Sequence, residues 1–266
     1  MRRVLTAAVL LSVLVAIAHF GSHELFVVVV AAAVAVACDE AARLFAARGG
    51  PPFRVLAVVG GTALVVTQAF GERAGLTPTG VWLATLVAVP LAAMALRENT
   101  DDMAEAAAGT LLPIAMIAWP LSTLVLIRAA PAGQRWIYLL FICTILADTA
   151  AYYVGRAIGK RKLAPAISPN KTWAGAFGGM AAAVLGAVVA CTLWIRQVPP
   201  ADAALLGAAI GFAAILGDLM ESMLKRHATV KDTSNLLPGH GGLLDRMDSL
   251  LFSAPLMLGY LWLRGL

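Results

Sequence analysis

Charged residues are scarce in this 266-residue chain, where Lys, Arg, Asp and Glu together make up 13%. A soluble domain carries roughly 25% charged residues, so the composition excludes an ordinary soluble protein. The chain also lacks a basic soluble domain, and its net charge of +5 is modest, which excludes nucleic acid as a partner. The remainder is 61% hydrophobic, which is typical of an integral membrane protein.

Cysteine is also sparse, with three residues that stand alone in apolar runs, Cys38, Cys143 and Cys191. No Cys-x-x-Cys pair and no Cys/His spacing suggests zinc, so we interpret all three as packing residues. A clean small-x-small cleavage site is missing as well. The apolar run that follows Met1-Arg2-Arg3 is therefore interpreted as a first spanning helix, with a signal peptide as the alternative.

Apolar runs long enough to cross a bilayer recur along the whole chain, separated by Gly- and Pro-rich loops. Nine segments fit this description, at residues 4–20, 24–46, 53–70, 78–96, 105–127, 135–158, 173–195, 201–221 and 249–263. The first and last are the shortest. The sequence therefore predicts an all-α fold, a polytopic transmembrane helix bundle of about nine spanning helices.

The distribution of basic residues predicts the orientation of this bundle. With the N-terminus in the cytoplasm and the segments alternating in direction, 15 of the 20 Lys and Arg residues lie on the cytoplasmic side. The two large polar loops, at about 156–172 and 222–248, then share the cytoplasmic face. Two small-residue motifs, Gly175-x-x-x-Gly179 and Gly207-x-x-x-Gly211, indicate close helix packing, either inside the bundle or in a homodimer contact.

Three carboxylates, Asp39, Glu40 and Asp148, lie well inside apolar segments. Asp39 and Glu40 lie near the end of the second segment, where an ion pair of Asp39 with Arg43 and a functional role both stay open. Asp148 lies within the sixth segment, on the same helix face as Tyr152. A charge within a bilayer needs a partner or water, so Asp148 is predicted to serve a site or a buried hydrogen bond.

The loop after the sixth segment contains the sequence Ser168-Pro-Asn-Lys-Thr172. Lys171 supplies a cation that suits a phosphate, while Ser168 and Thr172 supply hydroxyl groups. A helix N-cap at the start of the seventh segment explains the two hydroxyl residues nearly as well. Both interpretations stay open.

The most polar stretch is residues 222–248, preceded by Asp218 at the end of the eighth segment. Asp218 shares a helical stripe with Glu221 or Ser222 and with Lys225, which fits a site or a plain ion-pair cluster. Further along, Gly241 and Gly242 permit positive φ, so their backbone N–H groups can form an anion-binding nest. His240 in the same turn adds a donor or a base, or is structural.

Asp245 and Asp248 follow this turn, and they share a face if they open the last helix. Oxygen ligands without Cys or ligand-spaced His favour magnesium over zinc. Asp218 and Asp245 come from separate segments, which suits a cation held between helices, and a second cation stays open.

This stretch resembles the C-terminal signature of the phosphatidate cytidylyltransferases, the CDP-diacylglycerol synthases. The family pattern runs Ser-x-apolar-Lys-Arg, four residues, Lys-Asp, then Pro-x-His-Gly-Gly and Asp-Arg-apolar-Asp. Its fixed positions are all filled, by Ser222, Leu224, Lys225, Arg226, Lys231, Asp232, Pro238, His240, Gly241, Gly242, Asp245, Arg246, Met247 and Asp248. The elements Asp148-x-x-Ala-Tyr152, Ser168-Pro-x-Lys-Thr172 and Gly217-Asp-x-x-Glu-Ser222 also look like this family's.

The resemblance implies transfer of CMP from CTP to phosphatidic acid, giving CDP-diacylglycerol and pyrophosphate in magnesium-dependent phospholipid biosynthesis. Catalysis is assigned to Asp218, Asp245, Lys225, Arg226, Lys231 and His240. Phosphate binding is assigned to Lys171, Ser168, Thr172, Ser222, Gly241, Gly242 and Arg246. Metal binding is assigned to Asp218 and Asp245, with Asp148 and Asp248 as further ligands or supporting groups.

We expect one integral membrane domain over 1–266, with N-terminal spanning helices at 1–130 and catalytic helices and cytoplasmic loops at 131–266. The short, Ala-rich chain suggests a bacterial inner membrane, with membrane lipids as further partners and the active site on the cytoplasmic side. One alternative is a related CTP-dependent transferase acting on another lipid phosphate or alcohol. Another is an ion-coupled transporter, although its acids should lie near the midplane of paired repeats.

Overall fold

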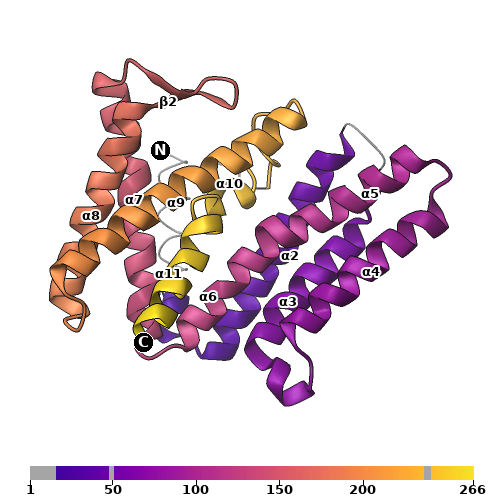
Figure 1. Cartoon of the computed structure of the whole chain (residues 1–266), viewed down its shortest axis with the longest axis horizontal. Coiled ribbons are helices and arrows are strands. Elements are labelled where there is room, and N and C mark those ends of the chain that lie inside the picture. Colours follow the sequence, from indigo (N-terminus) through magenta and orange to yellow (C-terminus); the bar gives the residue numbers. More distant parts are fainter. Residues whose placement is uncertain (1–15, 48–50, 237–240) are drawn as a thin grey trace. The chain divides into compact units, whose positions relative to one another are not determined.

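The structure is a computed structural model that describes residues 16–47, 51–236 and 241–266 (Figure 1). Most of the first predicted segment, 4–20, and His240 lie outside the described residues. The described helices are α2 (His23–Ala46), α3 (Arg54–Ala74), α4 (Pro78–Leu96), α5 (Thr100–Pro113), the π-helix η1 (Ile114–Ala118), α6 (Trp119–Ala129), α7 (Gly133–Ile158), α8 (Trp173–Trp194), α9 (Pro200–His227), α10 (Leu244–Met247) and α11 (Leu250–Arg264). A single hairpin of β1 (Lys162–Ala164) and β2 (Ser168–Thr172) interrupts them in the described part of the chain.

Seven spans among the described residues are long and apolar enough to cross a membrane. They are α2, α3, α4, the continuous run Thr100–Ala129, α7, α8 and α9. Each coincides with a predicted apolar segment, which confirms an all-α polytopic membrane fold. The last predicted segment, 249–263, corresponds to α11, whose 15 residues fall short of the about 20 that a straight span needs.

Short polar residues fix where several of these helices begin, because the first backbone N–H groups of a helix have no partner inside it. The side chain of Ser22 accepts a hydrogen bond from the Leu25 N–H at the start of α2. Thr77 caps α4 in the same way, with Pro78 in its first turn. Asn99 caps α5 through the Asp102 N–H.

The chain divides into two compact units, which are described separately. The first unit comprises Met1–Leu126 and Leu224–Met247, and the second comprises Ile127–Met223 and Asp248–Leu266. In the first unit, α2 packs on α3, α5 and η1, α3 packs on α4, and the short helix α10 packs on α2. Helix α10, which belongs to the C-terminal signature, thus packs against a helix near the N-terminus of the chain.

In the second unit, α7 and α8 lie side by side and the β1–β2 hairpin connects them (Figure 1). Gly175 and Gly179 permit this contact, since a Cβ built on either would lie 2.6 Å from a backbone oxygen of α7. On α9, a Cβ built on Gly207 would lie 2.7 Å from the Ala183 backbone oxygen of α8, and one built on Gly211 would lie 3.1 Å from the Ala183 Cβ. Both small-residue motifs therefore pack helices inside this unit, as the first of the two interpretations predicted.

Candidate active site

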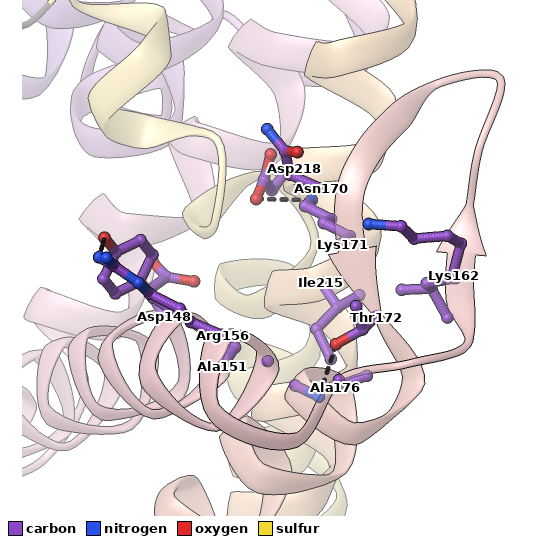
Figure 2. Close-up of a pocket in the computed structure, with 15 residues that line it drawn as sticks. Asp148, Ala151, Arg156, Lys162, Asn170, Lys171, Thr172, Ala176, Ile215 and Asp218 are labelled. Carbon is purple, nitrogen blue, oxygen red and sulfur yellow. Dashed lines mark hydrogen bonds and ion pairs between the residues drawn. The ribbon is translucent and has the colours of Figure 1, made fainter.

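A cavity of about 500 Å³ opens in the second unit among α7, the hairpin, the start of α8 and α9 (Figure 2). Its volume lies in the range of small-molecule sites, roughly 300–1,000 Å³. The polar side chains that line it are Asp148, Tyr152, Arg156, Lys162, Asn170, Lys171, Thr172 and Asp218. The cavity thus contains basic side chains, carboxylates and neutral hydrogen-bond donors. Such a lining suits a phosphate group with a bound metal ion.

The hairpin places Lys171 and Thr172 in this cavity. Strands β1 and β2 pair antiparallel with Lys162 opposite Thr172. The Thr172 hydroxyl oxygen accepts a 3.1 Å hydrogen bond from the Gly175 N–H and so caps α8. The N-cap interpretation is confirmed for Thr172 and wrong for Ser168, which lies at the start of β2 and pairs with Ala164.

Lys171 is paired with Asp218, the first of the predicted metal ligands. The Lys171 Nζ lies 2.5 Å from Asp218 Oδ2, and both side chains are partly exposed to the cavity (Figure 2). The Ser222 hydroxyl donates to Asp218 Oδ1 at 3.3 Å, one helical turn further along α9. The predicted phosphate ligands Lys171 and Ser222 thus contact the predicted metal ligand Asp218 directly.

Asp218 also belongs to a group of three carboxylates. Asp218, Glu221 and Asp248 each offer an oxygen atom, and these atoms lie within 4.8 Å of one another. Two unit charges 4 Å apart repel by about 4 kcal/mol at an effective dielectric constant near 20, so the group favours a bound cation. An all-oxygen donor set suits a hard divalent cation.

Glu221 was not among the predicted ligands, although it shares the helical stripe of Asp218. It is fully buried, and its position one turn after Asp218 brings both carboxylates to the same face of α9. Helical spacing from Asp218 was the only signal for Glu221 in the sequence. Glu221 is at i+3 and Ser222 at i+4, and both positions lie on the same helix face as Asp218, so spacing alone did not distinguish them.

Asp248 reaches this cluster because the chain leaves helical geometry there. Helix α10 ends at Met247 and α11 begins at Leu250. The Asp248 carboxylate accepts a 2.7 Å hydrogen bond from the next backbone N–H, at Ser249, a local contact that competes with helix formation. Asp245 and Asp248 therefore do not open the last helix, and the condition under which they were expected to share a helix face is not met.

Asp148 is linked to the cluster through a single hydroxyl group. The Ser249 hydroxyl lies 2.8 Å from Asp148 Oδ2 and 3.3 Å from Asp248 Oδ1. On the cavity side of α7, the Arg156 guanidinium donates to the Tyr152 hydroxyl at 3.1 Å. Asp148 thus lines the cavity and makes a partly buried hydrogen bond, but the residue itself is exposed, so its role in a site stays a prediction.

Asp245 belongs to the first unit, where hydrogen-bond donors surround it. Its Oδ1 accepts from Lys225 Nζ at 2.7 Å. Its Oδ2 accepts from the N–H and hydroxyl of Thr233 at 2.8 and 2.7 Å, and from the Gly242 N–H at 2.8 Å. The cluster of Asp218, Glu221 and Asp248 does not include Asp245, so its shared cation with Asp218 stays a prediction.

The Gly-rich turn uses its backbone differently from the predicted anion nest. Gly241 adopts the expected positive φ, 80°. The Gly242 N–H, however, donates to Asp245, so this amide is already occupied and is not directed to a phosphate. The phosphate contact of Gly242 therefore stays a prediction, which requires this amide to exchange Asp245 for a phosphate oxygen.

Three predicted cationic residues of the first unit are exposed to solvent, namely Arg226, Lys231 and Arg246.

Glu40 is the second functional candidate that the sequence did not assign. It is 3% exposed on α2 and accepts hydrogen bonds from Thr233, Ser234, Leu243 and Leu244. Its neighbour Asp39 pairs with Arg43, as predicted, and also with Arg54. The signal for Glu40 was a carboxylate deep in an apolar segment, which identified no partner.

The protein is therefore an all-α polytopic membrane protein. Its cavity is lined by basic side chains and by Asp218 of the carboxylate cluster. The chain belongs to the Cytidylyltransferase family, which it matches over residues 1–264.

Curated relatives with the name phosphatidate cytidylyltransferase occur in diverse bacteria. The protein from Pseudomonas aeruginosa is 43% identical over 155 residues, which cover 58% of this chain and 56% of the relative. The protein from Bacillus subtilis is 44% identical over 122 residues, or 45% of each chain. The protein from Synechocystis is 45% identical over 129 residues, covering 48% of this chain and 43% of the relative. The chain thus spans about half the length of the curated relatives it matches.

Proposed function

We propose that this protein transfers CMP from CTP to phosphatidic acid, giving CDP-diacylglycerol and pyrophosphate in phospholipid biosynthesis. The observation that carries the proposal is the Lys171–Asp218 ion pair in a cavity of about 500 Å³, beside the Asp218, Glu221 and Asp248 carboxylates. Family membership and the names of the bacterial relatives support the same reaction. A phosphate-seeking cation beside a hard-cation site is the equipment that nucleotidyl transfer uses.

The donor set fits magnesium, and we propose that Asp218, Glu221 and Asp248 hold it, with Asp148 supporting Asp248 through Ser249. When bound, the ion neutralises negative charge on the phosphates of the nucleotide. Asp245 remains proposed as a further ligand, and a second cation remains open.

In the proposed reaction, a phosphate oxygen of phosphatidic acid bonds to the α-phosphorus of CTP. The bond from that phosphorus to pyrophosphate breaks, and the leaving oxygen takes the electron pair. Lys171, Lys162 and Arg156 line the cavity and stabilise the charge on the phosphates. The attacking phosphate is already ionised, so its activation requires no general base; His240 is retained as a proposed donor only.

Further residues of the signature, and two hydroxyl residues of the hairpin, are also proposed to contact phosphates. Lys225, Arg226, Lys231 and Arg246 are proposed to meet the triphosphate or the lipid phosphate, and Gly241 to approach the nucleotide. Thr172 lines the cavity, where its hydroxyl is proposed to donate to a phosphate, whereas Ser168 remains a weaker proposal. These contacts require positioning rather than covalent catalysis.

We further propose a cytoplasmic N-terminus, about nine spans and a bacterial inner-membrane location with the active site on the cytoplasmic side. The excess of Lys and Arg on one side of the predicted bundle supports this orientation. The protein is proposed to work as one membrane domain, with spanning helices at 1–130 and catalytic helices and loops at 131–266. A homodimer remains an open proposal.

The test is an assay of the purified protein with magnesium, radiolabelled CTP and phosphatidic acid. We expect a labelled CDP-lipid and an equal amount of pyrophosphate. Asp218→Asn should abolish transfer, while Glu98→Gln, a change at an exposed carboxylate, should leave it unchanged. Replacing phosphatidic acid by an isoprenoid phosphate or alcohol tests the alternative acceptors. Label transferred only to an isoprenoid acceptor would replace the proposed substrate.

A further inference from the structure

Glu40 connects two parts of the chain that are distant in sequence. Its four hydrogen-bond donors follow it by 193 to 204 residues, and all belong with it to the first unit. Oε1 accepts from the Ser234 hydroxyl at 2.6 Å and the Leu243 N–H at 3.1 Å. Oε2 accepts from the Thr233 hydroxyl at 3.2 Å and the Leu244 N–H at 2.8 Å. One carboxylate of α2 thus satisfies both ends of the polar loop that leads to α10.

Gly242 and Thr233 pack tightly against the Glu40 carboxylate. A Cβ built on Gly242 would lie 2.1 Å from the Thr233 hydroxyl oxygen and 2.6 Å from Glu40 Oε2. The Thr233 hydroxyl also lies 2.7 Å from Asp245 Oδ2, so its single proton is shared between two buried carboxylates. A buried carboxylate with several backbone donors fixes geometry as well as adding stability, since each contact is directional.

We propose that Glu40 is a positioning residue for the signature segment, here defined as residues 231–236 and 241–247. The inference rests on the proposed function, because it assigns Glu40 the task of holding Asp245 and the segment that carries Lys231 and Arg246. It gives the N-terminal helices a role in the reaction: α2 supplies the group that orders the signature segment. Glu40 itself contacts no substrate and takes no part in bond making.

The decisive variant is Glu40→Gln, which preserves shape and removes one acceptor oxygen. Whichever way the new amide is turned, its NH₂ group faces the backbone N–H of Leu243 or Leu244. The matched control is Asp39→Asn on the same turn of α2, which removes a carboxylate that pairs with Arg43 and Arg54 instead.

Two readouts separate positioning from general stability. Hydrogen exchange of peptides from the signature segment should accelerate by about tenfold or more in Glu40→Gln, while α3 and α4 stay protected as in the wild type. The kcat should fall by about tenfold or more, because the disordered segment carries Lys231 and Arg246, which are proposed to contact the phosphates. Asp39→Asn should change neither quantity.

Exchange that rises uniformly across the first unit, or a kcat equal to that of the wild type, would overturn the proposal. If Glu40→Gln does not fold, Thr233→Val and Ser234→Ala each remove one donor and should accelerate exchange of the same segment and lower kcat. Unchanged exchange and kcat in both would reject the role of Glu40. A wild-type protein that makes no CDP-lipid would refute the proposed function alone, since exchange reports on the segment without any substrate.

Discussion

Lys225 and Asp245 form a buried ion pair in the first unit, with Nζ 2.7 Å from Oδ1 and side chains that are 12% and 4% exposed. Both residues belong to the polar signature, and both were expected to face substrates or a cation. In the structure each satisfies the other, and the pair ties the C-terminal end of α9 to α10. Their first effect is therefore on the architecture of the signature segment.

Replacing Lys225 by a neutral residue should destabilise the protein. Lys225→Met leaves the Asp245 carboxylate buried without its countercharge, and breaking a buried pair costs about 3–5 kcal/mol. The free energy of unfolding, measured by denaturant titration in detergent, should fall accordingly. Lys231→Met, a change at an exposed lysine nearby, should lower it by less than about 0.5 kcal/mol. Equal effects of the two substitutions would contradict the structural role of the pair.

The cap of α8 predicts a difference between two small substitutions at Thr172. Thr172→Val removes the hydroxyl that accepts from the Gly175 N–H, and the loss of such a cap costs about 1 kcal/mol. Thr172→Ser retains the hydroxyl and should remain close to the wild type. Thermal unfolding of the three proteins in one detergent measures this order, and a Ser variant as unstable as the Val variant would argue against capping.

The contact of α7 with α8 predicts intolerance of a methyl group at Gly179. A Cβ there would lie 2.6 Å from the Ala147 backbone oxygen, so Gly179→Ala should destabilise by about 1–3 kcal/mol through overpacking. Gly259→Ala is the matched control, since nothing lies within 4 Å of its Cβ position on α11. Unfolding midpoints should fall only for Gly179→Ala, and an unchanged midpoint would contradict the close packing.

If Asp218 binds the proposed magnesium, Lys171 competes with that ion, and removal of Lys171 should have opposite effects on magnesium binding and on turnover. Lys171→Met should tighten magnesium binding by about three- to tenfold, because a positive charge 2.5 Å from Asp218 is lost. The same variant should lower kcat by about 10²-fold, since the cavity loses a phosphate ligand. Magnesium titrations and steady-state assays measure the two effects, with the exposed Lys160→Met as control. Weaker magnesium binding in Lys171→Met would contradict the competition.

Long apolar runs allowed the sequence to predict the helices well. Segments such as 24–46 and 78–96 agree with α2 and α4 within about a residue, because bilayer thickness and cap residues together fix length and ends. The β1–β2 hairpin was predicted only as a polar loop. Its strands have three and five residues, too few for a periodic pattern to separate strand from turn.

The sequence predicted the site residues whose positions depend on local helical spacing. It missed those whose positions depend on contacts between distant segments. Asp218, Asp148 and Lys171 do line one cavity, since each was recognised as a polar group in or beside an apolar helix. The break before α11, which separates Asp248 from Asp245, depends on side-chain hydrogen bonds to the backbone. The partners of Glu40 lie more than 190 residues away, and no local pattern encodes them.

The most direct test of the account is manganese binding measured by electron paramagnetic resonance, with manganese in place of magnesium. If Asp218, Glu221 and Asp248 hold one cation, then Asp218→Asn, Glu221→Gln and Asp248→Asn should each weaken binding by at least about tenfold, and Glu98→Gln should leave it unchanged. Wild-type affinity in all three carboxylate variants would contradict the central claim that this cluster is the cation site.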